Sequence, residues 1–442
     1  MKKKFIYIIA GLLAVGLGSL APHFWDIYHY LPIQKKEIHI FFETYATGPA
    51  FSHMIEFSKL DKNTRKIIGW NRFTNRAQLF DLKAYNTVEI PMQQSNLKAS
   101  ENLFSFAATV FDEITKDPAA TLVLHSSFDK VASVLKPLLT VVPKQRIKEI
   151  HLYEDGYGDV FKWTDDILNQ DAQYSKNLKD ETEKLLNNPM RKAWHIRHVF
   201  GLRELYPVTY HFLNASKMKD IERFSKLNTL LKDANIQDTN FENFSKTLTE
   251  EQKQIVYQLS GFDYERFKKL MLNKKSIMFV TGFYFNDQRY IDAEMKVLSL
   301  IQENKLNNFT LENPQDYVWL FKAHPASGDI YKKNGLKEKF PNIVEVPSSI
   351  PFEIFILSGL KPTLTAGFSS SLFFSLNDKD ILFYAKRPKY NTSPLSRLGD
   401  HYLAALIKDK LIRNDQIILY EDYFTESILM NKNPQLKGLY VD

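Results

Sequence analysis

The sequence predicts an α/β protein with two domains, each built on a parallel β-sheet. Short apolar runs alternate with amphipathic segments from Glu37 to Tyr153, and the alternation returns from Ser276 to Ala385. Strands and helices in regular turn are typical of parallel sheets with helices on both faces. The 442 residues suit two domains of ordinary size. Residues 163–275 form long polar, helical stretches, so we expect a helical connector.

Composition excludes several classes of protein. With 44% hydrophobic and 25% charged residues, the chain is globular rather than disordered. It has no cysteine, which excludes disulfides, thiolate metal sites and a cysteine nucleophile. The net charge of +7 is scattered, which favours a solvated surface over an anionic partner such as a nucleotide or an acidic lipid surface. No motif indicates a nucleic-acid partner.

The N-terminal segment, residues 1–34, is set apart from the fold. A basic head, residues 2–4, precedes an apolar run over residues 5–21, whose length lies between a signal-peptide core and a membrane span. Ser19-Leu20-Ala21 resembles a cleavage site only weakly, and Pro22 follows it directly. We therefore favour an uncleaved membrane anchor over a removed signal.

The predicted elements suggest the domain boundaries. The first domain is expected over residues 35–205 and the second over residues 206–412, with the apolar piece 207–213 as a crossing between them. Residues 413–442 are expected to pack back on the first domain. Strands are expected at 37–42, 65–70, 86–90, 120–126, 147–153, 276–282, 317–325, 343–347, 362–367 and 381–385. Helices are expected at 100–114, 128–138, 291–304 and 352–357, and from Ser370 onward.

Two carboxylates follow the predicted strand 147–153. Glu154 and Asp155 stand at its end, and Gly156 comes next. Open α/β sheets present their chemistry at the carboxyl ends of strands, so a catalytic carboxylate is one interpretation. Glu-Asp-Gly is also ordinary turn composition, and on the tripeptide alone a turn is favoured.

The second domain offers two further strand ends with reactive residues. Lys322, His324 and Pro325 close one strand, where an imidazole can bind or protonate a phosphate. Ser370 and Ser371 stand where a helix is expected to begin, a place that suits either capping or anion binding. Taken singly, a structural histidine and simple caps are favoured.

Other catalytic motifs are missing from the sequence. It contains no H-E-x-x-H pattern, P-loop, complete G-x-G-x-x-G or G-x-S-x-G, so neither a metal site nor a hydrolase of the nucleophile-elbow class is indicated.

Glu353, at the start of a predicted helix, could accept hydrogen bonds from a ribose or interact with the helix dipole.

Taken together and in order, these motifs resemble a known family. The set comprises Tyr-Glu-Asp-Gly after one strand, Phe-Lys-Ala-His-Pro after another, and Gly-Phe-Ser-Ser-Ser-Leu-Phe-Phe-Ser-Leu after a third. It resembles the bacterial sialyltransferases of glycosyltransferase family 80, the Pasteurella and Photobacterium type. Further blocks of the likeness, which runs from about residue 37 onward, lie at 69–73, 206–211, 248–252 and 351–353.

The resemblance implies a GT-B fold, with two Rossmann-like domains and the active site in the cleft between them. Family members transfer N-acetylneuraminic acid (Neu5Ac) from CMP-Neu5Ac to a galactose-containing acceptor, with inversion and without an essential metal. The first domain would then carry the general base and the acceptor, and the second would bind the donor. CMP-Neu5Ac is a substrate, so no cofactor is expected.

The resemblance also assigns roles to residues. Asp155 resembles the general base, His324 the residue that meets the donor phosphate and assists departure of CMP, and Ser370 and Ser371 the phosphate-binding pair. Lys322 and Glu353 match the positions that hold cytidine and ribose. The remaining matches are Pro325 and Gly282 on the donor side, and Arg72, Asn96, Glu154 and Gly156 on the sugar side.

The sequence departs from the family at places that bear on acceptor choice. Relatives usually have Asp-Asp-Gly-Ser where this chain has Glu154-Asp155-Gly156-Tyr157, and some carry a tryptophan where residues 283–286 read Phe-Tyr-Phe-Asn. The linkage formed, α2,3 or α2,6, therefore stays open.

The expected function is that of a membrane-anchored sialyltransferase acting on a cell-surface glycan, with lipooligosaccharide as a candidate acceptor. Two alternatives are another GT-B transferase with a CMP- or CDP-activated donor, such as a Kdo or capsule enzyme, and a silent glycan-binding protein on the same fold. Retention of both Asp155 and His324 argues against the silent protein.

The expected location is a bacterial inner membrane, through one N-terminal anchor, and the protein is expected to be a monomer. The basic head favours a cytoplasmic N-terminus and an exported body, whereas CMP-Neu5Ac is made in the cytoplasm. A helix lying in the membrane interface would reconcile the two, and the sequence does not choose between them.

Overall fold

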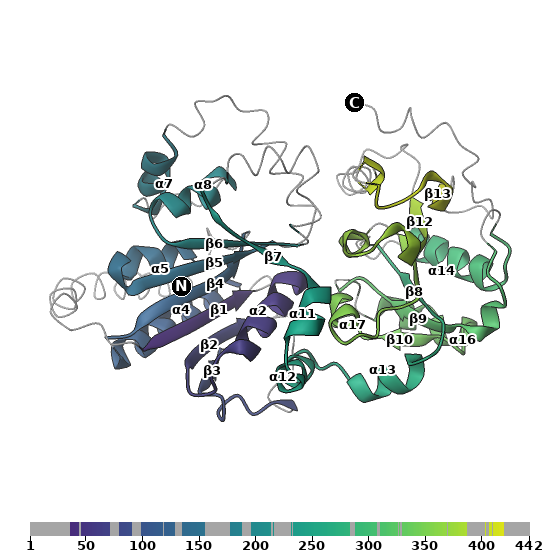
Figure 1. Cartoon of the computed structure of the whole chain (residues 1–442), viewed down its shortest axis with the longest axis horizontal. Helices are drawn as coiled ribbons and strands as arrows, with labels where there is room; N and C mark the ends of the chain where they lie inside the picture. The colour runs from purple at the N-terminus through teal and green to yellow at the C-terminus, as the bar shows by residue number, and fades with distance from the viewer. Residues whose placement is uncertain are drawn as a thin grey trace, which may run out of the picture.

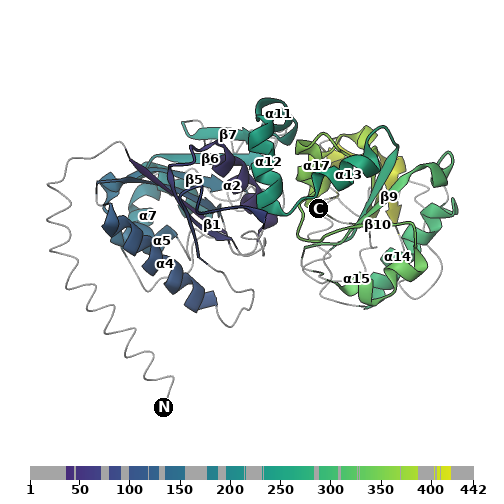
Figure 2. The same cartoon turned by 90° about the horizontal axis from the view of Figure 1, so that it is seen from below.

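Two parallel sheets form the framework of the protein. The computed structural model describes residues 36–419 except 44–45, 71–78, 91–98, 118, 129–134, 155–176, 188–195, 214, 216–230, 232, 283–287, 307–309, 326, 328, 369, 387–402, 404–405 and 409. In Figures 1 and 2 the sheets lie side by side, the first purple to teal and the second green to yellow. The predicted α/β fold class is confirmed.

The first sheet has seven parallel strands in the order β3-β2-β1-β4-β5-β6-β7. Their bounds are β1 Glu37–Glu43, β2 Arg65–Trp70, β3 Thr87–Glu89, β4 Thr121–Ser127, β5 Ile147–Tyr153, β6 Val208–Leu213 and β7 Asn235–Thr239. Its described helices are α2 Thr47–Lys59, α4 Ala99–Lys116, α5 Lys136–Val141, α7 Leu178–Leu186 and α8 Ile196–Gly201, with 3-10 turns η4 Lys144–Arg146 and η6 Leu202–Glu204. The described part of the predicted helix 128–138 is helical only toward its end, where α5 begins.

Strand β1 shows why these segments form a covered parallel sheet. Its apolar run is buried on both faces, as parallel strands between helix layers require. Phe42 points to α4, where its ring lies 4.4 Å from that of Phe106 between centroids, and Phe41 points to α2, where Phe57 lies at 6.2 Å. Alternate residues of one strand thus anchor opposite helix layers.

The second sheet has six parallel strands in the order β10-β9-β8-β11-β12-β13. Their bounds are β8 Ser276–Val280, β9 Val318–Lys322, β10 Val344–Val346, β11 Leu364–Phe368, β12 Ile381–Lys386 and β13 Ile417–Leu419. The described helices are α14 Gln288–Gln302, α15 Ile330–Lys333, α16 Leu336–Lys339 and α17 Glu353–Leu357, with 3-10 turns η7 Pro314–Asp316, η8 Ser371–Ser375, η9 Asp378–Asp380 and η10 Asn414–Gln416. The helix predicted from Ser370 is therefore the 3-10 turn η8.

Three helices connect the sheets: α11 Phe241–Thr247, α12 Glu250–Ser260 and α13 Tyr264–Met271. A capping box of Thr249 and Gln252 starts α12, and Gly261, with φ of 73°, ends it. Helix α12 packs on α2 of the first domain, whereas α11 contacts α17 of the second. Figures 1 and 2 show α11 and α12 between the two sheets.

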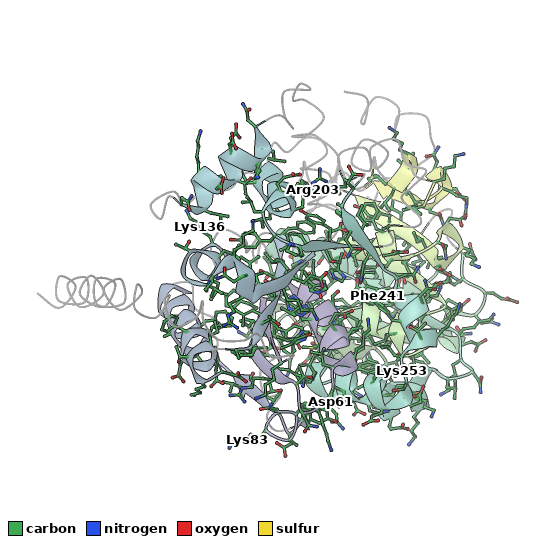
Figure 3. All side chains as sticks on the ribbon, turned by 60° about the vertical axis from the view of Figure 1, so that its left-hand side comes forward. Asp61, Lys83, Lys136, Arg203, Phe241 and Lys253 are labelled. Carbon is green, nitrogen blue, oxygen red and sulfur yellow. The ribbon has the colours of Figure 1, made fainter. Side chains whose placement is uncertain are left out.

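The aromatic residues of the connector contact both domains. Phe241 of α11, labelled in Figure 3, lies 5.5 Å from Phe51 of α2 between ring centroids. Phe262, after α12, lies 5.2 Å from Phe355 of α17. All four rings belong to one apolar cluster that contains residues of both sheets.

One predicted boundary is wrong, and the predicted return of residues 413–442 to the first domain is contradicted only for the described residues 413–419. Residues 207–213 are not a crossing into the second domain, because β6 pairs with β5 and β7 pairs with β6 in the first sheet. The first sheet therefore extends to Thr239, well beyond residue 205. The C-terminal residues that the structure describes do not return to the first domain, because β13 pairs with β12 of the second sheet. Residues 420–442 lie outside the described part.

The predicted anchor, residues 1–34, also lies outside the described residues. From Lys36 to Leu419, the described helices include none that is both long and apolar enough to cross a membrane.

A glycine in β11 allows β11 to lie close beside β8 in the second sheet. Gly367 has φ of 138°, and a Cβ built there would lie 2.0 Å from the carbonyl oxygen of Val280 in β8. Gly367→Ala should therefore destabilise the protein by more than about 4 kcal/mol, because both backbone strain and backbone overlap oppose it. Thermal unfolding or urea titration measures the loss.

Gly359→Ala is the matched control, since Gly359 has φ of 73° but nothing within 4 Å. This variant should lower the free energy of unfolding by only about 1–2 kcal/mol. Equal losses in the two variants would contradict the overlap argument.

Candidate active site

The described candidate residues of the second domain gather at the carboxyl edge of its sheet. Lys322 ends β9, Gly282 follows β8, and Ser370 follows β11. These three strands are neighbours, and Lys322 and Gly367 both pair with Val280 between them. Parallel strands bring their carboxyl ends to one edge, which is where open α/β sheets bind ligands.

Lys322 and the partly buried Glu353 interact electrostatically at this edge. The Lys322 side chain is buried, and its Nζ donates to the carbonyl oxygen of Ser348 at 3.4 Å. Burial lowers the pKa of Lys322 to about 8, and the charge of Glu353 opposes the shift. Burial also raises the pKa of Glu353, which Lys322 and a backbone hydrogen bond counteract. Both side chains can offer hydrogen bonds to a nucleoside.

The backbone of His324 is fixed by its neighbours. Its N–H donates to Thr281 Oγ1 at 3.0 Å, and its carbonyl oxygen accepts from the Ser327 N–H at 2.8 Å. Thr281 in turn donates its N–H to the carbonyl oxygen of Lys322 at 3.2 Å. The partly buried imidazole and Pro325 therefore extend from a turn that is tied to both β8 and β9.

The two serines begin the 3-10 turn η8. Ser370 caps it, since its Oγ accepts from the Leu372 N–H at 3.4 Å. Ser371 is the first residue of the turn, and both serines are partly buried. The capping interpretation is thus present in the structure, and it leaves both hydroxyl groups at the edge that Lys322 and Gly282 occupy.

Glu154 is the only predicted site residue of the first domain within the described part of the chain. Asp155, Gly156, Arg72 and Asn96 lie outside it. The Glu154 side chain is 3% exposed, and its Oε2 accepts from the Leu213 N–H at 2.9 Å. Its own N–H donates to the carbonyl oxygen of His211 at 3.1 Å. This attachment to β6 favours a structural role for Glu154 over the predicted sugar contact.

Comparison with known proteins identifies the family. The family model described as "Sialyltransferase PMO188" matches residues 38–397. The chain belongs to this sialyltransferase family. The predicted resemblance is thereby confirmed, and the protein is a glycosyltransferase by family. A comparison with curated proteins gives no match.

Solved structures similar to this sialyltransferase share its fold. The GT-B domain of a Photobacterium damselae sialyltransferase has 18% identity and a TM-score of 0.69, with 87% of this chain and 100% of that chain covered. An α/β-galactoside α-2,3-sialyltransferase of Photobacterium phosphoreum has 19% identity and a TM-score of 0.68, with 87% and 99% covered. A 2,6-sialyltransferase of Photobacterium sp. JT-ISH-224, solved with CMP and lactose, has 20% identity and a TM-score of 0.67, with 87% and 78% covered. The predicted GT-B fold is confirmed.

Three further residues at the strand ends have roles that no sequence motif indicated. Thr281 and Glu294 hold the backbone at the carboxyl edge of the second sheet, hereafter the proposed donor edge, at His324 and Gly282 respectively. Glu43 ends β1 at the carboxyl edge of the first sheet, is 1% exposed, and accepts from the Ala46 N–H at 2.9 Å. The only signal for Glu43 was a carboxylate at a strand end.

A row of histidines crosses the first sheet. His39 Nδ1 lies 3.1 Å from His125 Nε2, and His125 Nδ1 lies 2.9 Å from the Tyr153 hydroxyl. His151 stacks on His125 with ring centroids 4.7 Å apart, and its Nδ1 lies 2.9 Å from His211 Nε2. These residues come from the adjacent strands β1, β4, β5 and β6.

Helix α2 adds His53 to this row. His53 is fully buried, accepts at Nδ1 from Trp70 Nε1 at 3.3 Å, and packs edge-on against Tyr153 at 4.7 Å between ring centroids. Burial lowers the pKa of His53 to about 3 and that of His39 to about 4. It also lowers the pKa values of His125 and His211 well below their usual range. His39, His53, His125 and His211 are therefore neutral at pH 7.

Neither a metal cluster nor a second anion site is evident in the described part. No group of three or more histidine, aspartate or glutamate side chains there is arranged to hold a metal ion. A cavity of about 820 Å³ lies at the opposite, amino edge of the first sheet. Its basic residues pair with acidic ones, as in Lys36 with Asp117 and Arg65 with Glu113, so it has no excess of positive charge to bind a nucleotide.

Proposed function

We propose that this sialyltransferase transfers Neu5Ac from CMP-Neu5Ac to a terminal galactose of a glycan, with inversion at the anomeric carbon and without an essential metal. The observation that carries the proposal is the gathering of Gly282, Lys322, His324, Ser370 and Glu353 at one sheet edge. The family resemblance implies a donor contact for each of them, which supports the proposal.

The donor edge has the chemistry that a CMP leaving group requires. Charge develops on the CMP phosphate as its bond to the sugar breaks. Fixed donors stabilise such charge without the reorganisation that water would need. A protonated His324 and the hydroxyl groups of Ser370 and Ser371 can supply these donors, while Lys322 and Glu353 hold the nucleoside.

The acceptor side requires one base. In a single displacement, the galactose oxygen forms a bond to the anomeric carbon while the bond from that carbon to the phosphate oxygen breaks. The hydroxyl proton passes to Asp155, and the electron pair of the broken bond goes to CMP. Such a base and a phosphate site on opposite domains account for inversion in one step.

Acceptor and location belong to the same proposal. We assign a galactose-terminated glycan as acceptor, with lipooligosaccharide as the candidate, and a monomeric enzyme held at the bacterial inner membrane by its N-terminal segment. A similar 2,6-sialyltransferase was solved with CMP and lactose, which supports these classes of donor and acceptor.

The test is to incubate the full chain in mild detergent with CMP-Neu5Ac and lactose, with and without EDTA. Wild type should release CMP and form sialyl-lactose at the same rate in both. His324→Ala should lower kcat by about 10²–10⁴-fold, because it removes the proton donor to the leaving group. NMR of the product gives the anomeric configuration and linkage. Absence of product from a range of galactosides would refute the proposed donor, and full activity of His324→Ala would refute only the role of that residue.

A further inference from the structure

A buried carboxyl group lies behind the donor edge. Glu294 of α14 is 0% exposed, and its Oε1 accepts from the Gly282 N–H at 2.9 Å. Its Oε2 accepts from the hydroxyl group of Tyr331. Tyr331 lies in α15, the first helix after the turn with His324 and Pro325. Glu294 therefore links the segment that leaves β8 to the segment that leaves β9.

Both hydrogen-bond partners of Glu294 are neutral. Burial raises its pKa to about 8, and the hydrogen bonds from Tyr331 and Gly282 act in the opposite direction. An apolar side chain would avoid the cost of burying a carboxyl group, so filling space does not explain this residue. Holding two separate segments by hydrogen bonds does explain it, because buried polar groups that are satisfied specify one arrangement of their partners.

A second link runs through the residue next to Gly282. Thr281 accepts the His324 N–H at its hydroxyl oxygen and donates its own N–H to the carbonyl oxygen of Lys322. Residues 281 and 282 are thus held from one side by the turn after β9 and from the other by α14. The position of the His324 turn depends on this pair of residues.

We propose that Glu294 is a positioning residue of the donor site, which fixes Gly282 and Tyr331 and thereby holds the His324 turn against the donor phosphate. This inference rests on the function proposed above, because donor kinetics are one of its readouts. Glu294 acts through its neighbours and touches no substrate.

Two variants of the full chain separate this role from mere packing. Glu294→Gln is neutral and of the same shape, so its amide oxygen can accept from Gly282 while its NH₂ donates to the Tyr331 oxygen. Glu294→Ala removes both hydrogen bonds. The alanine variant should raise the KM for CMP-Neu5Ac and lower kcat, for a loss of about 10–100-fold in kcat/KM, as small displacements of positioned groups do. The glutamine variant should stay within about threefold of wild type, because both hydrogen bonds survive. The KM for lactose should not change.

Asp380→Ala is the matched control. Asp380 is also a buried carboxylate of the second domain, but it bonds to Lys361 and precedes β12, at the opposite edge of the sheet. It should lower the melting temperature as Glu294→Ala does, yet leave the donor KM unchanged. Equal kinetic losses in the two alanine variants, or an equal loss in Glu294→Gln, would overturn the positioning role.

Amide hydrogen exchange of the ligand-free protein provides a readout that needs no substrate. Peptides that contain Gly282 and Tyr331 should exchange faster in Glu294→Ala than in wild type or Asp380→Ala. If wild type forms no product from CMP-Neu5Ac but shows this exchange pattern, the proposed function fails and the positioning role stands. Unchanged exchange in Glu294→Ala overturns the positioning role, whatever the activity.

Discussion

Asp155→Asn should lower kcat by about 10²–10⁴-fold, because the amide cannot accept the proton of the acceptor hydroxyl group. Binding of CMP-Neu5Ac should persist, since the proposed donor contacts lie on the other domain. Steady-state kinetics with lactose, together with calorimetric titration of CMP, separates the two effects.

Glu154→Gln is the matched control for this prediction. Glu154 directly precedes Asp155, but its carboxylate is buried against β6 and accepts the Leu213 N–H. A glutamine keeps this hydrogen bond through its amide oxygen, so kcat should change by no more than about threefold. A larger loss in Glu154→Gln than in Asp155→Asn would reverse the assignment of the base.

Acid should destabilise the protein from about pH 6.5 downward, which is a higher pH than carboxylate titration alone would require. The buried histidines have folded-state pKa values lowered to about 4 for His39 and about 3 for His53. Their unfolded values lie near 6.5. A lowered folded pKa means that stability is complete above the unfolded value and is lost as pH falls below it, because the unfolded chain binds the protons.

The expected size of this effect is large. By pH 5, His39 and His53 together should lower the free energy of unfolding by up to about 4 kcal/mol. His125 and His211 act in the same direction. Among charged neighbours, Glu37 opposes the shift of His39, and Lys66 reinforces it. Urea unfolding at pH 7.5, 6.0 and 5.0 measures the loss.

His53→Gln provides the comparison for the acid effect. The amide oxygen can still accept from Trp70, but the residue no longer takes up a proton. Between pH 6.5 and 5, unfolding of this variant should therefore take up about one proton fewer than unfolding of wild type, so its unfolding free energy should depend less on pH. Unchanged stability of wild type from pH 7.5 to 5 would show that burial does not hold His39 and His53 neutral.

Local patterns in the sequence sufficed for β1 to β5, for β8 to β12 and for the motifs of the proposed donor edge, but not for β6, β7 and β13. The strand at 147–153 and the Lys322–Pro325 motif are contiguous, and parallel topology places such strand ends together. The boundary at residue 205 was wrong because only strand pairing shows to which sheet β6 and β7 belong.

Residues that act through distant partners could not be predicted in this way. Glu294 contacts Gly282 and Tyr331, which are 12 and 37 positions away, and its own helix gives no sign of either contact. The histidine row depends on the register of four strands, in which His125 pairs directly with His151. No local periodicity contains that information.

The apolar cluster around Phe241 couples the stability of the two domains. Because it joins α2, α11 and α17 in one continuous core, neither domain can unfold without exposing surface of the other. If CMP binds at the proposed donor edge, it should therefore stabilise the first domain as well, by mass action on a shared unfolding equilibrium. The nucleotide would then contribute to the integrity of the first domain, although its proposed contacts lie on the second sheet.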